Sequence, residues 1–360
     1  MHKLKSIYFL IFCGFVISLI YANFNLNNFD KLISNKTHYM IKGDLNLIWD
    51  EAEVFKNDIS NNKNFLEAGK IYTRTYLHSK YIAALSIIFN KDLFENHKRK
   101  IIKPENNFIF LFTQISIFYL SVIFFYKKLS IFISDEKTVY FTILFLSLEP
   151  TILQWHPSFW TESIYFSLMI LTLSLIISDK KTFINFGLIG FMLGALYLQK
   201  SVSILLIAPL IIYFFFTKIE KKIFKINVLV FSYLFILVGL GYSNFLKTGS
   251  FYVLSPQTKD SAQYHYLLPR IFEEKQKVNN NIDLEKIELI ESKWKQENSY
   301  DGNNFKDRLK LGKFKQSKSI EVMLENKFIT AKLYLMGIAR HALLNPFQNY
   351  YWYVYNSETH

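Results

Sequence analysis

The sequence predicts an all-α polytopic membrane protein with about seven transmembrane helices, a large first outer loop and a helical outer C-terminal segment. The 360-residue chain is 51% hydrophobic and 18% aromatic, with a mean hydropathy of +0.14, which is too apolar for one ordinary soluble domain. Its apolar residues are also gathered into runs whose lengths approach the ~20 residues that cross a bilayer as a helix.

Seven runs have this character, and tilt or flanking lysine and tyrosine side chains can accommodate the shorter ones. They are residues 6–23, 108–126, 138–153, 162–178, 183–198, 202–217 and 226–246. Lys3 and Lys5 ahead of the first run also fit a secretory signal. Because residues 20–22 lack the small side chain expected three positions before a cleavage site, we interpret this run as an uncleaved helix.

The lysines of the short loops predict that the N-terminus is cytoplasmic in a bacterial-type inner (plasma) membrane. Lysine-rich segments at the N-terminus and in the turns 127–137, 179–181 and 218–225 fall on one side if the runs alternate. By the positive-inside rule that side is the cytoplasm. The basic stretch 97–104 lies in the long loop 24–107, and charge in so long a loop has little influence on the orientation of the helices in the membrane. This stretch therefore does not reverse the prediction.

The chain then divides into a membrane module, residues 1–246 with the outer loop 24–107, and an outer segment, residues 247–360. Apolar spacing predicts amphipathic helices around residues 44–59 and 282–296, and the apolar stretch 81–89 is too short to span. Near the C-terminus, lysine, arginine and histidine side chains make a span costly, which favours an interfacial helix over an incomplete eighth span.

The balance of charge and the rarer residue types exclude several function classes. The net charge of +13 comes from lysines spread over the loops without a nucleic-acid recognition motif, which favours anionic lipid or a phosphorylated substrate over nucleic acid. The single cysteine, Cys13, excludes an intramolecular disulfide. The histidines lack ligand spacing and no glycine-rich phosphate loop is present, which argues against a metal centre and nucleotide chemistry.

Acidic and basic residues on the predicted outer face are the candidate functional residues. Glu149 and Glu162 flank a proline-containing turn at the membrane edge, where a carboxylate is costly unless it faces a cavity, a partner or headgroup water. A group of four acids in the first outer loop shares that face, as does Lys200, which either snorkels or binds a phosphate. The four acids are Asp44, Asp50, Glu51 and Glu53, and a further basic cluster suited to an anionic headgroup is Arg74, His78 and Lys80.

Taken in order, five segments resemble the GT-C superfamily of integral-membrane glycosyltransferases, which includes the protein O-mannosyltransferases and the aminoarabinose transferases that modify lipid A. The sequence departs from the family near His78, where the prolines that the family carries are missing. Family members also usually continue with further helices, so the resemblance implies a shortened member or an incomplete chain. The segments are KGDLNLIWDEAEVF, YTRTYLHSKYIAALSIIF, LEPTILQWHPSFWTESIYF, FGLIGFMLGALYLQKSVSILLIAPLIIYF and YSNFLKTGSFYVLSP.

The resemblance implies transfer of a sugar from a polyprenyl-phosphate donor to a hydroxyl of a lipid, glycan or protein acceptor. Asp44 or Asp50, with Glu51 as neighbour, would be the base, and Glu162 would bind the acceptor or orient a basic partner. The donor-binding residues would be Arg74, His78, Lys80 and Lys200, of which Lys200 with Arg74 or Lys80 would neutralise the leaving phosphate. Some relatives use a divalent metal, and nothing in this sequence requires one.

Two other functions remain open from the sequence. A lipid or glycan transporter or flippase would favour short outer loops, internal symmetry and helices broken at mid-membrane, whereas this chain places its prolines and acids towards one face. A polysaccharide polymerase would carry its large, arginine-rich outer loop late in the chain, whereas here the late segment is rich in lysine.

Overall fold

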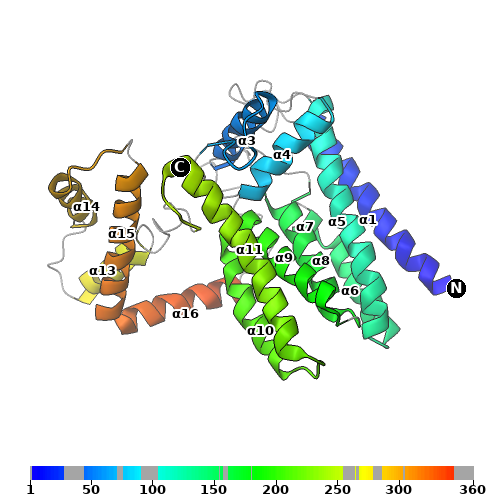
Figure 1. Ribbon diagram of the computed structural model, residues 1–360. Helices are drawn as coiled ribbons and strands as arrows, with labels where there is room; N and C mark the ends of the chain where they lie inside the picture. The colour runs from blue at the N-terminus through cyan, green and yellow to red at the C-terminus, as the bar shows by residue number, and fades with distance from the viewer. Residues whose placement is uncertain are drawn as a thin grey trace. The chain divides into compact units, whose positions relative to one another are not determined.

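The computed structural model describes most of the chain as helices in two compact units (Figure 1). The chain passes from unit 1 to unit 2 between Ser243 and Asn244, within the same long helix that contains the predicted boundary at Leu246. Every regular element in the described ranges is helical. These ranges are 2–27, 44–70, 76–90, 104–153, 155–156, 161–179, 181–253, 264, 267–278, 286–302 and 305–343.

Each of the seven predicted apolar runs falls on helix, and all but the last three residues of the seventh run lie in unit 1. The run 138–153 is divided between α6 and α7 because Pro150 cannot continue the preceding helix, and the run 202–217 begins as a 3₁₀ turn. The elements are α1 (His2–Asn27), α3 (Asp44–Ser60), α4 (Tyr76–Ile88), α5 (Pro104–Phe132), α6 (Glu136–Leu148), α7 (Pro150–Leu153), α8 (Glu162–Ile177), α9 (Phe183–Gln199), η2 (Ser201–Leu206), α10 (Ile207–Phe216) and α11 (Lys222–Thr248).

Three of these helices are long and apolar enough to cross a membrane. They contain the candidate spans Ser6–Asn27, Asn107–Phe132 and Lys222–Thr248, whereas α8, α9 and the η2–α10 stretch are apolar but shorter. Large apolar side chains such as Phe12, Phe231 and Phe235 are exposed on the first and last of them, as expected for surfaces that contact lipid. A membrane protein is supported, and the seven-span topology stays a prediction.

Unit 1 is organised around α5, which packs against α1, α6 and α8 (Figure 1). Gly14 lets these helices approach closely, since a Cβ there would overlap the Ser147 carbonyl oxygen and lie 2.9 Å from the Tyr119 hydroxyl oxygen. The Tyr119 hydroxyl lies 3.0 Å from Ser18 Oγ and donates to the Ser147 carbonyl at 3.0 Å. Helices α3 and α4 pack together at one end of this bundle.

A glycine-containing face of α9 packs directly on α11. A Cβ at Gly190 would overlap the Leu229 carbonyl oxygen, and one at Gly194 would lie 2.7 Å from Ile236 Cβ. Small residues allow such close contact between membrane helices, where packing replaces the hydrophobic driving force. Helix α9 ends at Gln199, which belongs to the candidate site.

Gly190→Ala is expected to lower the stability of the protein by about 1–3 kcal/mol, because the new methyl group must push α9 away from α11. The matched control is Gly187→Ala, whose Cβ would make ordinary contacts of 3.5 Å with Ser232 and 3.6 Å with Val228. Thermal unfolding of both variants in detergent checks this expectation. Equal melting temperatures would show that the two helices are not held at this distance.

Unit 2 consists of short helices around a small core, with Tyr264, Leu268, Ile271 and Val322 at its centre. The predicted amphipathic helix 282–296 corresponds to α14, and the apolar C-terminal stretch is interrupted at Asn326. The helices are α13 (Leu268–Val278), α14 (Lys286–Glu297), α15 (Phe305–Glu325) and α16 (Lys327–Leu343). The preference for an interfacial helix over a further span in this stretch stays a prediction.

Candidate functional site

Glu149 has a local role in the turn between α6 and α8. It is the C-cap of α6, where its backbone N–H donates to the Phe145 carbonyl at 2.9 Å. Its carboxylate accepts the Ile152 N–H at 2.8 Å and so caps α7. Residues 157–160, which hold the second proline and tryptophan of this stretch, lie outside the described residues.

Glu162 and Lys200 form a close ion pair where α8 begins and α9 ends. Lys200 Nζ donates to Glu162 Oε1 at 2.6 Å, with side chains that are 31% and 17% exposed. Helices α8 and α9 are joined by a short turn, so Glu162, the first residue of α8, lies beside Lys200, the residue that follows α9. The carboxylate is therefore at the positive end of the α8 dipole, and the ammonium is at the negative end of the α9 dipole. Lys200 Nζ also lies 5.5 Å from the centroid of the Tyr165 ring. This cation is therefore held in place while a third of its side chain stays accessible.

Glu51 and Lys80 form a second pair, which is buried between α3 and α4. Lys80 Nζ lies 3.7 Å from Glu51 Oε1, and the two side chains are only 7% and 8% exposed. The ammonium also lies 3.6 Å from the centroid of the Phe55 ring and 4.6 Å from that of Tyr76. Ring faces attract a desolvated cation, so the aromatic side chains supplement the carboxylate.

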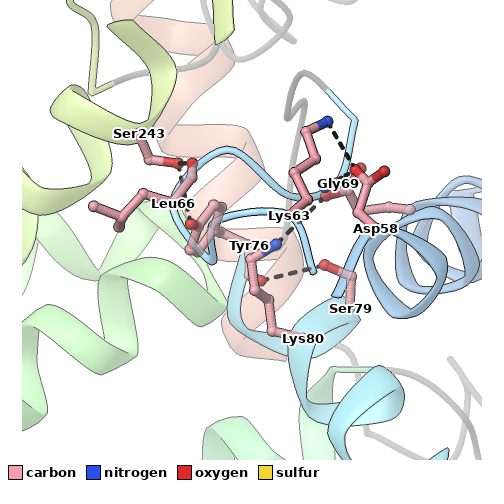
Figure 2. A network of polar contacts seen from close by, with 9 residues as sticks. Asp58, Lys63, Leu66, Gly69, Tyr76, Ser79, Lys80 and Ser243 are labelled. Atoms are coloured by element: carbon pink, nitrogen blue, oxygen red, sulfur yellow. Dashed lines mark hydrogen bonds and ion pairs between the residues drawn. The ribbon is translucent and has the colours of Figure 1, made fainter. Parts of the chain in front are cut away.

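The turn 61–70 lies against this buried pair through Gly69, which Figure 2 shows near Lys80. Gly69 has φ +86°, and a Cβ there would lie 2.6 Å from Glu51 Oε1 and 3.3 Å from Lys80 Nζ. Only glycine combines this backbone conformation with so close an approach. The Gly69 N–H donates to Asp58 Oδ2 at 2.8 Å, which holds the turn against α3.

Ser243 of α11 holds the same turn from the other side (Figure 2). Its hydroxyl donates to the Leu66 carbonyl at 2.6 Å and lies 3.3 Å from the Tyr76 hydroxyl. Burial raises the pKa of Tyr76, and the nearby charge of Glu51 adds to this, while the Ser243 hydrogen bond acts in the opposite direction. Tyr76 therefore stays a neutral hydrogen-bonding group at physiological pH.

A buried glutamine connects the two ion pairs. Gln199 Nε2 lies 3.2 Å from His78 Nδ1 and donates to the Thr161 carbonyl at 3.0 Å. Gln199 precedes Lys200, Thr161 precedes Glu162, and His78 is on the same helix as Lys80. Because an amide nitrogen only donates, His78 accepts at Nδ1. The structure thus brings α4, the start of α8 and the end of α9 together.

The other predicted site residues are placed differently. Asp50 lies 3.9 Å from Lys70, and these side chains are 31% and 52% exposed, so this carboxylate is accessible. Asp44 is the first residue of α3, with its side chain outside the described residues, as is the whole of Arg74. The burial of Lys80 argues against its predicted contact with a phosphate, because its charge already faces Glu51 and two aromatic rings.

Gln199, Thr161 and Gly69 were missed by sequence reasoning. Gln199 had a usable signal, since an amide at the end of a long apolar run needs a buried partner. Thr161 participates through its backbone carbonyl, which any residue would supply. Gly69 resembles any loop glycine until its positive φ is known.

The arrangement offers an accessible cation, Lys200, beside the Glu162 carboxylate, and a second accessible carboxylate, Asp50, on α3, which packs on α4. Such groups can bind an anion and accept a proton. Within the described part of the chain, no group of three or more histidine, cysteine or acidic residues could hold a metal ion. Comparison of the chain with protein-family models, with curated proteins and with solved structures gives no match in any of the three.

Proposed function

We propose that the protein is a membrane glycosyltransferase that moves a sugar from a polyprenyl-phosphate donor to an acceptor hydroxyl on the outer face of the membrane. The observation that supports it best is the series Glu51–Lys80, His78–Gln199 and Glu162–Lys200, which unites the first-loop helix with the turn before α8. These are the segments that the GT-C resemblance marks as functional.

In this proposal Lys200 binds the leaving phosphate. The acceptor oxygen attacks the anomeric carbon, the bond from that carbon to the phosphate oxygen breaks, and the lipid phosphate leaves with the bonding electrons. A cation already oriented by Glu162 stabilises that developing charge without reorganisation. Lys200 is suited to the task because it is both held and partly exposed.

An acid of α3 receives the acceptor proton. Asp50 is accessible and its contact with Lys70 at 3.9 Å is loose, so an acceptor hydroxyl can displace the lysine. Glu51 is buried against Lys80, so in this proposal Glu51 holds α3 in place and is not the base. Asp44, at the start of the same helix, is the alternative base.

A transporter or flippase is the second candidate, and the buried polar groups of unit 1 favour it. Gln114, His156 and Ser163 are fully buried, with Gln114 Nε2 donating to the His156 carbonyl at 2.5 Å and His156 Nδ1 lying 3.1 Å from Ser163 Oγ. Polar residues between membrane helices often line a substrate pathway. A polysaccharide polymerase would use the same chemistry as the first proposal with a growing glycan as acceptor.

The proposal is tested by incubating the purified protein with a panel of radiolabelled polyprenyl-phosphate sugars and separate lipid, glycan and peptide acceptors. Glu162→Gln is expected to lower transfer by about 10²-fold or more, because Lys200 loses its charged partner. Asp50→Asn or Asp44→Asn is expected to abolish transfer while folding is retained.

Glu149→Gln is the matched control, since it lies in the same turn and its amide oxygen can still cap α7. We expect it to retain nearly full transfer. Loss of activity in Glu149→Gln but not in Glu162→Gln would reverse the assignment of this turn. Full activity in both aspartate variants would remove α3 from the mechanism, and movement of intact donor across vesicles without transfer would favour the flippase.

A further inference from the structure

One exposed face of unit 2 changes from basic to apolar along α15. Lysines occupy the face in the first half of the helix, and Ile320 and Leu324 occupy it in the second half, where Leu324 is 70% exposed. Intervals of three and four residues place these side chains on one side of the helix. In order along the chain the face carries Lys306, Lys310, Lys313, Ser317, Ile320 and Leu324.

Exposed apolar side chains also occupy α16, the helix that follows α15. Phe328 is 83% exposed, and Leu335 and Met336 are also exposed. The orientation of α16 is fixed, because Ile329 and Leu333 pack on the core of unit 2. An ion pair of 2.7 Å between Lys332 and Glu274 also ties α16 to α13. The exposed residues are therefore presented outward by a packed helix.

The exposed apolar side chains of α15 and α16 are as large as those that form the small core of unit 2, which is unusual for a surface that faces only water. We propose that this surface, the α15–α16 face, docks on an anionic membrane surface, with its lysines at the headgroups and its apolar end inserted among the acyl chains. The face consists of Lys306, Lys310, Lys313, Ile320, Leu324, Phe328 and Leu335.

Two observations favour lipid as the occupant. Unit 2 begins within α11, one of the three helices long and apolar enough to span, so the chain itself brings this unit to the bilayer surface. The graded character of the face matches the order of groups in a bilayer interface, where lysine side chains reach anionic headgroups beside an inserted apolar surface. A second copy of the chain would bring the same lysines against each other in a parallel pairing, and against the apolar end of the face in an antiparallel one.

Site-directed fluorescence of the full chain in nanodiscs tests the proposal. Cys13 is replaced by serine, and a single cysteine at Leu324 or Phe328 is labelled with an environment-sensitive dye. The control position is Ser292, an exposed residue of α14 outside the face. We expect lipids with a spin label near the headgroup to quench the dye at Leu324 and Phe328 but not at Ser292.

The lysines are tested with the combined Lys306→Glu, Lys310→Glu and Lys313→Glu variant. We expect it to weaken quenching in nanodiscs that contain phosphatidylglycerol and to have little effect in phosphatidylcholine alone. Three results would overturn the proposal. An unquenched dye with water-like emission would mean that the face is exposed to water. An unquenched dye with apolar emission would mean that protein covers the face. Stronger quenching from a spin label at the end of the acyl chain would mean that the helix spans the membrane.

Discussion

Replacing Lys80 with methionine is expected to lower the stability of the protein by about 3–5 kcal/mol, because Glu51 then keeps its charge in a buried position without the cation beside it. Methionine fills a similar volume between Phe55 and Tyr76, so the loss reflects charge rather than a cavity. Thermal and denaturant unfolding of the protein in detergent micelles measures the change. Because the pair is buried, this is the largest stability effect among the variants proposed.

Lys70→Met is the matched control, since Lys70 also pairs with an acid of α3 but both partners are substantially exposed. Its effect is expected to stay within about 1 kcal/mol, as for other solvent-screened pairs. The double variant Glu51→Gln, Lys80→Met should be more stable than Lys80→Met alone, because no buried charge is left unpaired. Similar losses from Lys70→Met and Lys80→Met would mean that water reaches both pairs in solution.

The helices could be predicted because the bilayer limits which residues a spanning segment contains. Each predicted apolar run falls on helix, three of these helices are long and apolar enough to span, and Pro150 marks the division between α6 and α7. The periodic spacing of apolar residues similarly located α3 and α14. The apolar runs, the break at Pro150 and the amphipathic spacing all depend on residues that are close together in the sequence.

The partners within the site could not be predicted, because they are distant in the sequence. Glu162 and Lys200 were each candidates, yet their contact depends on how α8 and α9 turn back on each other. The burial of Lys80 depends on Gly69, whose backbone brings the turn onto the ion pair. The sequence gives the residue types but not which lysine is enclosed and which remains accessible.

That difference between two lysines leads to the second large effect. Lys200→Met is expected to lower sugar transfer by about 10²–10³-fold, because the leaving phosphate loses the cation that stabilises it. Its effect on stability should remain within about 1 kcal/mol, since the pair with Glu162 is partly exposed and screened by solvent. The measurement combines initial rates of transfer with an unfolding curve for the same preparation.

Lys181→Met is the matched control, because Lys181 lies in the turn at the opposite end of α8 and α9 and donates to the Ile176 carbonyl. It should retain transfer. Lys200→Arg should retain part of the transfer rate that Lys200→Met loses, since arginine carries the same positive charge on a larger, planar group. If Lys200→Met transfers sugar normally, the cation does not bind the phosphate. If it unfolds as readily as Lys80→Met, the Glu162–Lys200 pair is structural, and the site must be sought at the acids of α3.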